Sequence, residues 1–198
     1  MIVVTVDQQG SRRVGDRVED LLAELHRFGG LTRPFERTIG DEVQAVLVDP
    51  ALAVDVALHV LRLGGWSIGI GVGAVVEPLP ATTREASGPA FVHARTAVER
   101  SKSRLRPVPL AVEAEDPDRA REAEGVLTLL GSIVTRRTDA GWAVIDELAS
   151  SAGTTQEAVA ARLGISQQAV SQRVRTAMWA EELAVRPVAA RLLAEGER

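Results

Sequence analysis

The chain has 198 residues, of which 45% are hydrophobic and 25% charged, and its formal net charge is −4. This composition is typical of an ordinary globular protein with one large or two small domains, and the negative charge argues against nonspecific coating of nucleic acid. The absence of cysteine excludes disulfides, a thiolate nucleophile and cysteine-ligated metals. No apolar run reaches the roughly 18 residues of a membrane span. The first residues predict a strand rather than a signal peptide, so a cytoplasmic protein without membrane association is expected.

Hydrophobic periodicity predicts alternating strands and helices in the first part of the chain. The expected strands are 1–6, 35–39, 43–48, 66–76 and 108–112. The expected helices are 11–28, 50–63 and 89–101, and glycine pairs end the first two. This order predicts the α+β class, with a ferredoxin-like α/β sandwich that carries its helices on one face of the sheet. Gly69, Gly71 and Gly73 alternate within strand 66–76, which predicts that something approaches that face closely.

The remaining segments divide the chain into predicted domains of residues 1–113 and 138–198, joined by residues 114–137. An acidic, proline-containing linker (113–118) leads into a helix at 118–135. The apolar stripe of this helix is either a dimer seam or intramolecular core; it consists of Val126, Leu129, Leu130 and Ile133. A short helix at 142–148 and a final segment at 185–194 flank the most informative stretch of the sequence, residues 154–178.

Residues 154–178 predict a helix-turn-helix, because each position of that motif has a suitable residue. Apolar residues at helical spacing, a small residue where helices cross, a C-cap glycine and an N-cap serine follow in register. They are Val159, Ala160, Leu163, Gly164, Ile165, Ser166, Val170 and Val174. The pattern therefore predicts an all-α DNA-binding domain, although a solvated helical hairpin would have the same spacing.

The second helix of this motif has a polar face suited to DNA. Its side chains can bond to base edges, and its arginines can also bind phosphate. The predicted DNA-binding residues are Ser166, Gln167, Gln168, Ser171, Gln172, Arg173 and Arg175. Between residues 158 and 180 there are three arginines and no acid. Such a small positive charge predicts that tight binding to double-stranded DNA needs a homodimer.

Two carboxylates and one lysine mark a second candidate site. Asp7 ends the first strand and Asp41 lies in a predicted hairpin, a placement that can hold Mg²⁺ together with a nucleotide triphosphate. A Gly-Asp pair is also an ordinary hairpin signal, so a purely structural role stays open. Lys102 is the only lysine among 23 basic residues. Either this lysine occurs by chance in a chain whose other basic residues are arginines, or its compact ammonium group has a function that arginine cannot supply.

Several segments together resemble the SatD-like family. They are residues 7–12 (DQQGSR), 38–44 (TIGDEVQ), 88–91 (GPAF) and 163–171 (LGISQQAVS). The first domain is in turn similar to class III nucleotidyl cyclases and GGDEF-type diguanylate cyclases, and Ala94, Ala97 and Lys102 repeat a spacing of the latter. The resemblance implies that Asp7 and Asp41 bind divalent metal and that Lys102 meets phosphates. The nucleotide-binding residues that it implies are Asp7, Gly10, Ser11, Arg12, Gly40, Asp41, Glu42 and Lys102.

The sequence also departs from the cyclase pattern. Ile39 occupies the place of a second glycine before Asp41, and His93 and Arg95 lie two apart rather than four. We therefore expect a DNA-binding transcriptional regulator whose first domain senses a ligand or mediates dimerisation and has lost or altered its catalysis. The alternatives are a nucleotidyl cyclase or NTP-processing enzyme that uses Asp7, Asp41 and a divalent metal, and a module whose first domain only dimerises.

Overall fold

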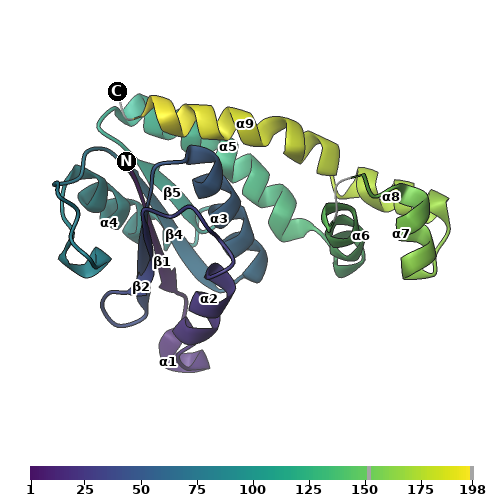
Figure 1. The fold of residues 1–198 in the computed structure, drawn as a ribbon, viewed down its shortest axis with the longest axis horizontal. Helices are drawn as coiled ribbons and strands as arrows, with labels where there is room; N and C mark the ends of the chain where they lie inside the picture. Colours follow the sequence, from purple (N-terminus) through teal and green to yellow (C-terminus); the bar gives the residue numbers. More distant parts are fainter. Residues whose placement is uncertain (151–152, 197–198) are drawn as a thin grey trace.

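A five-stranded sheet forms the centre of the computed structural model, which describes residues 1–150 and 153–196 (Figure 1). Its strands are β1 (Ile2–Gln8), β2 (Arg33–Arg37), β3 (Glu42–Leu47), β4 (Trp66–Val72) and β5 (Leu110–Glu113). They lie in the order β2-β3-β1-β4-β5. β1 pairs antiparallel with β3 and β4, β2 pairs antiparallel with β3, and β5 runs parallel to β4. The fold is therefore α+β, as the sequence predicts.

Helices surround this sheet and form most of the C-terminal region. They are α1 (Ser11–Val14), α2 (Val18–Leu25), α3 (Pro50–Leu63), η1 (Thr83–Glu85), α4 (Pro89–Ser101), α5 (Pro117–Arg136), α6 (Asp139–Ala149), α7 (Gln156–Leu163), α8 (Gln167–Thr176) and α9 (Trp179–Glu195). Within the described ranges, no helix combines the length and the apolar character needed to cross a membrane.

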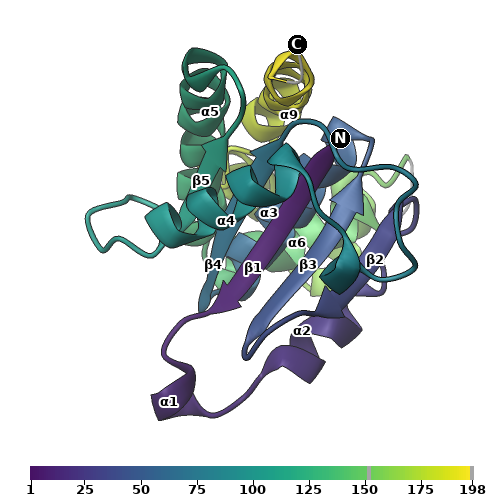
Figure 2. The same cartoon turned by 90° about the vertical axis from the view of Figure 1, so that its left-hand side faces the viewer.

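Helices cover both faces of the sheet, so the prediction of helices on one face only is wrong (Figures 1 and 2). On one face, α2, α3 and α5 enclose the main hydrophobic core, to which β1 contributes Val4 and Val6. On the other face α4 packs against β4 and β1, and Val3 meets Ala90 and Ala94. Because successive side chains of a strand point to opposite faces, β1 supplies apolar residues to both cores.

The glycines of β4 allow α4 to approach the sheet at backbone distance, as their alternation predicts. A Cβ atom at Gly69 would lie 2.3 Å from the backbone nitrogen of Val98. A Cβ atom at Gly71 would lie 2.2 Å from the carbonyl oxygen of Ala90. Only glycine fits at such distances. What approaches the strand is therefore the backbone of the protein's own helix.

The segment 11–28 forms two short helices rather than the single predicted helix. The break lies at residues 15–17, where the buried side chain of Gln8 forms hydrogen bonds with the backbone at both ends of the break. Its Nε2 donates to the Gly15 carbonyl at 2.6 Å, and its Oε1 accepts from the Arg17 amide at 2.8 Å. The Asp16 side chain then accepts from the Val18 amide. Hydrogen bonds from a neighbouring strand thus replace the helical bonds that periodicity predicts.

Other boundaries differ from the predictions for local reasons. β4 ends at Val72 because its partner β1 begins at Ile2, which leaves no strand opposite the predicted residues 74–76. Thr138 caps α6 by accepting from the Gly141 amide, so this helix starts earlier than predicted. The C-terminal helix α9 is also longer than the predicted segment 185–194.

The helix α9 returns from the helix-turn-helix region to the sheet and packs against α3 and α5 (Figure 1). Its Ala189 and Leu193 belong to the main core. The predicted domain range 138–198, whose residues 151–152 and 197–198 lie outside the described residues, thus includes a helix that completes the core of the first domain.

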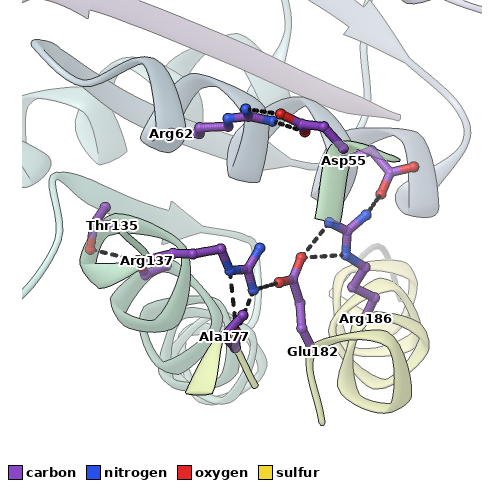
Figure 3. A network of polar contacts seen from close by, with 9 residues as sticks. Asp55, Arg62, Thr135, Arg137, Ala177, Glu182 and Arg186 are labelled. Atoms are coloured by element: carbon purple, nitrogen blue, oxygen red, sulfur yellow. Dashed lines mark hydrogen bonds and ion pairs between the residues drawn. The ribbon is translucent and has the colours of Figure 1, made fainter. Parts of the chain in front are cut away.

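A buried ion pair joins the two parts of the chain (Figure 3). Arg137, at the start of the α5–α6 connection, bonds to Glu182 of α9, and both side chains are 0% exposed. Arg137 also donates to the carbonyl of Ala177 at 2.7 Å. Glu182 in turn binds Arg186, which reaches Asp55 of α3 at 2.8 Å. This network connects α3, α5, the end of α8 and α9.

Aromatic rings complete this junction. The guanidinium of Arg137 lies 4.3 Å from the ring centre of Trp142 and 5.7 Å from that of Trp179. Arg62 of α3 stacks on Trp142 at 3.8 Å and makes two 2.6 Å bonds to Asp146 of α6. Cation–π contacts therefore support the buried charge where its Nη1 lacks a hydrogen-bond partner among the described residues.

The predicted stripe of α5 divides between core and solvent. Leu130 is 1% exposed and packs in the main core, whereas Leu129 is 67% exposed. The buried face is formed by Ala120, Ala123, Leu127, Leu130, Gly131 and Val134. The stripe is thus divided: Leu130 lies in the core and Val126 packs against it, Ile133 is half-buried, and Leu129 is exposed.

The close approach of α4 leads to a prediction. Gly71→Ala should lower the free energy of unfolding by about 3 kcal/mol, because the new methyl group meets backbone that cannot move independently. Gly125→Ala is the control: this glycine lies within α5 with nothing near its Cβ position. That change should stabilise the protein by about 0.5–1 kcal/mol. Urea denaturation of both variants measures the effects, and equal stability of Gly71→Ala and the parent would contradict the close approach.

Candidate functional site

The helices α6, α7 and α8 form a small module with a core of its own. Val144 of α6 packs with Val159 and Ala160 of α7 and with Val170 of α8. Leu163, Ile165 and Val174 pack around this core. The α7–α8 connection is a helix-turn-helix in its local geometry, and the apolar residues that predicted it are the ones that hold it together.

The turn between α7 and α8 follows the sequence prediction closely. Gly164 adopts the left-handed conformation (φ 63°) that a C-cap requires. Ser166 caps α8, since its hydroxyl accepts from the Ala169 amide at 3.2 Å. Both residues set the angle at which α8 leaves the turn.

The polar side chains of α8 face away from the module core. Exposed residues at helical spacing form one face: Gln167, Gln168, Gln172 and Arg175. Ser166 is exposed at the start of the helix, whereas Ser171 and Arg173 are half-buried. The module projects at the opposite end of the molecule from α4 (Figure 1). The predicted DNA-binding residues are therefore brought together, with Arg173 at the edge.

A cavity of about 380 Å³ adjoins α8 on the side of α6. Gln172 and Arg173 line it together with Arg136 and the cap residue Thr138. Arg136 was not among the predicted DNA-binding residues, because the sequence places it in the segment 114–137 that joins the two predicted domains. Its position adds positive charge beside the predicted face.

The second candidate site lies at the C-terminal end of β1. Asp7 stands opposite Glu42 of β3 and Ser67 of β4 in the strand register. Its Oδ2 lies 3.2 Å from Nζ of Lys102, which follows α4. The glycines of β4 make this pairing possible, because they bring α4 down onto the sheet. Asp7 and Lys102, which the sequence singled out, are thus in direct contact.

The environment of Asp7 shifts the titration of its carboxyl group. Burial raises the pKa of Asp7, and the charges of Asp41 and Glu42 raise it further, against the opposing effect of Lys102. Burial lowers the pKa of Lys102, but bonds to Glu99 and Asp7 outweigh this effect and its pKa lies above the usual value. Asp41 and Glu42 are therefore near enough to Asp7 to act on it electrostatically, as the predicted site requires.

A cavity of about 800 Å³ lies beyond the end of β1 and is lined by residues of the β1–α1 loop, of α1 and of the connection from α4 to β5. Four of the predicted nucleotide-binding residues line it: Asp7, Gly10, Arg12 and Lys102. Glu42 instead lines a separate cavity of about 300 Å³ with Ile39, whose side chain is exposed at the rim. Ser11, Gly40 and Asp41 are not among the described residues that line either cavity.

The larger cavity contains arginines that the sequence interpretation missed. They are Arg13, Arg17, Arg104 and Arg106. Their signal was present as two arginine-rich segments, 12–17 and 104–106, but each arginine taken alone is typical of a solvated surface. Only the fold brings these two segments to the same cavity.

Gln9 holds the loop at the base of this cavity. Its Nε2 donates to the Trp66 carbonyl at 3.1 Å and to the Ser67 hydroxyl at 3.2 Å. Together with Gln8, it anchors the β1–α1 connection to the sheet. Gln8 and Gln9 therefore have a structural role here.

The side chains near Asp7 do not form a site that holds Mg²⁺ without further ligands. Magnesium requires near-octahedral oxygen coordination. The Asp7 carboxylate is engaged by Lys102, and Glu42 accepts from the Thr38 hydroxyl at 2.6 Å. Across residues 1–150 and 153–196, no cluster of three or more His, Cys, Asp or Glu is arranged to hold a metal. Metal binding by Asp7 and Asp41 stays a prediction.

Comparisons with known protein families, with curated proteins and with solved structures give no match to this chain. The two candidate sites therefore rest on the geometry of the fold and on the residues described above. One is a helix with an open polar face, and the other is an arginine-rich cavity beside the half-buried carboxylate of Asp7.

The raised pKa of Asp7 predicts how stability depends on pH. The folded protein holds this proton more tightly than the unfolded chain, so stability falls as the pH rises through the folded pKa. Asp7→Asn, which mimics the protonated form, should therefore raise the melting temperature at neutral pH. The gain should shrink as the pH is lowered to about 4. Thermal denaturation at several pH values tests this, with Glu122→Gln on the exposed face of α5 as control. A lower melting temperature for Asp7→Asn at neutral pH would contradict the interpretation.

Proposed function

We propose that this protein is a DNA-binding transcriptional regulator in which α8 reads the major groove. The carrying observation is the α7–α8 pair, whose apolar residues are buried while the polar face of α8 projects from the end of the molecule. Glutamine and arginine side chains have the donors and acceptors that base edges need. Arg136 and Arg173 line the cavity beside this face, and their guanidinium groups suit phosphate contacts that would orient the helix.

The first domain is proposed to be of the cyclase type, as the resemblance to the SatD-like family implies. The order β2-β3-β1-β4 of its first four strands, with α2 and α3 in the two connections, supports the proposal of a ferredoxin-like sandwich. The fifth strand extends this sheet. In this proposal the domain senses a nucleotide-like ligand or mediates assembly.

The enzyme alternative has one specific observation in its favour. Asp7 lines the cavity, and the charges of Asp41 and Glu42 contribute to its raised pKa. A catalytic role would require Asp7 to leave Lys102 when substrate and metal bind. Release of pyrophosphate from ATP or GTP in the presence of Mg²⁺ would favour this alternative over a sensing domain.

Substitutions on α8 test the proposed base reading. DNA fragments selected by the wild-type protein from a random pool supply the cognate site. Gln168→Ala should cost on the order of 1–3 kcal/mol on that site and little on random DNA. Arg175→Ala should weaken binding to both DNAs. It should also reduce the slope of affinity against salt concentration by about the amount that one phosphate contact contributes. Arg191→Ala, an exposed arginine near the far end of α9, is the matched control and should leave binding unchanged.

The outcomes of this experiment distinguish recognition of base edges by α8 from general electrostatic attraction to DNA. Equal losses for Gln168→Ala on cognate and random DNA would contradict base reading. A loss of equal size for Arg191→Ala would mean that overall charge, rather than α8, controls binding. Failure of the pool to yield any enriched sequence would count against the regulator itself.

A homodimer is part of the proposal, because one module has few cations for phosphate. Leu129 is the exposed residue of the α5 stripe, so Leu129→Glu should shift the protein toward monomer and weaken operator binding at least tenfold. Its neighbour Leu130 must be left intact, because it is core. Val48→Glu, at an exposed valine after β3, is the control. Sedimentation together with DNA titration measures both effects, and a wild-type monomer that binds DNA tightly would refute the dimer.

A further inference from the structure

The cavity beyond β1 has a large surplus of positive charge. Six cationic side chains line it, namely Arg12, Arg13, Arg17, Lys102, Arg104 and Arg106, against the single carboxylate of Asp7. The chain as a whole carries a net charge of −4. Cations gathered in a concave site repel one another, and an anion bound there relieves that repulsion.

Three of these arginines have no partner among the described residues. The side chains of Arg12, Arg13 and Arg104 make no ion pair or hydrogen bond with any residue in those ranges. Arg17 lies over the ring of Trp66 at 5.9 Å, Lys102 pairs with Asp7, and Arg106 binds Glu124 and the Leu110 carbonyl. The cavity therefore offers free guanidinium groups next to cationic side chains that are already held in place by contacts within the protein.

The free guanidinium groups come from two segments that the fold holds in place. Arg12 and Arg13 follow the β1–α1 loop, which Gln8 and Gln9 anchor to the sheet. Arg104 lies between Lys102 and Arg106, and both of these neighbours are held by ion pairs. A ligand that spans the two segments must carry several negative charges along its length.

Asp7 does not compete with these arginines, because Lys102 already compensates its charge at 3.2 Å. We infer that this cavity binds a polyphosphate chain, that of a nucleoside triphosphate or of inorganic tripolyphosphate, directly on guanidinium groups and without a divalent cation. Guanidinium forks match phosphate oxygens in geometry as well as charge. The inference rests on the proposed ligand-sensing role of the first domain and replaces the metal of the cyclase resemblance with arginines.

Affinity should then rise with the number of phosphates and fall when Mg²⁺ neutralises them. Calorimetry of the full chain is carried out with inorganic tripolyphosphate, ATP and GTP, each in EDTA and in excess Mg²⁺. The expected result is binding in EDTA, weaker binding of pyrophosphate and of AMP, and a loss of affinity with Mg²⁺. Equal binding of tripolyphosphate and ATP assigns the site to the phosphate chain alone, whereas tighter binding of one nucleotide assigns a base contact as well.

Variants test the named arginines. Arg12→Gln and Arg104→Gln should each weaken tripolyphosphate binding about tenfold. Arg121→Gln is the matched control: this arginine is exposed on α5 and pairs with Asp118 outside the cavity. The shift in melting temperature on adding tripolyphosphate is a second readout, because it reports both the folding of each variant and the binding.

Several results would overturn the inference. They are binding only in Mg²⁺, no heat and no thermal shift with any polyphosphate, and an equal loss for Arg121→Gln. A further result would assign the cavity to DNA instead. In that case polyphosphate binds to neither the parent protein nor the variants, and Arg12→Gln and Arg104→Gln lose DNA binding. None of these results depends on Gln168 or Arg175, so failure here is distinguishable from failure of the proposed DNA-binding function.

Discussion

The position of the helix-turn-helix depends on one buried charge. Arg137 lies between α5 and α6. Its partner Glu182 lies in the first turn of α9, the helix that follows α8. Both side chains are fully buried, so removing Glu182 would leave the charge of Arg137 without an ionic partner among the described residues, in a medium of low dielectric constant. The arginine must therefore bind Glu182 and the Ala177 carbonyl together. This requirement fixes the entry and exit of the module relative to each other.

The same junction connects the module to the sheet. α3 packs on the main core, and from it Asp55 binds Arg186 of α9 while Arg62 binds Asp146 of α6 (Figure 3). If a ligand in the cavity beyond β1 changes DNA affinity, the effect passes through these contacts or through a dimer, and by linkage DNA must change ligand affinity by the same factor.

A second constraint places the cavity itself. Because Gly69 and Gly71 have no side chains, α4 descends onto β4 until backbone meets backbone. The residue after α4, Lys102, then reaches Asp7 at the end of β1. The connection from α4 to β5 carries further arginines to the same place. A negatively charged protein thus concentrates positive charge at one point, next to the carboxylate that the sequence marked for a metal.

The sequence by itself determined the elements whose signals are local. The α+β class, the glycine approach at β4 and the turn at Gly164 and Ser166 follow from spacing, capping and backbone freedom, which neighbouring residues decide. The polar face of α8 follows from the same helical spacing, and so its residues were predictable. Only the tertiary structure decided the break in the first predicted helix, where the side chain of Gln8 in β1 donates to the carbonyl of Gly15 and accepts from the amide of Arg17. It alone also decided the burial of Leu130, the pairing of Arg137 with Glu182 and the meeting of Arg12 with Arg104 at one cavity, because each depends on segments far apart in the chain.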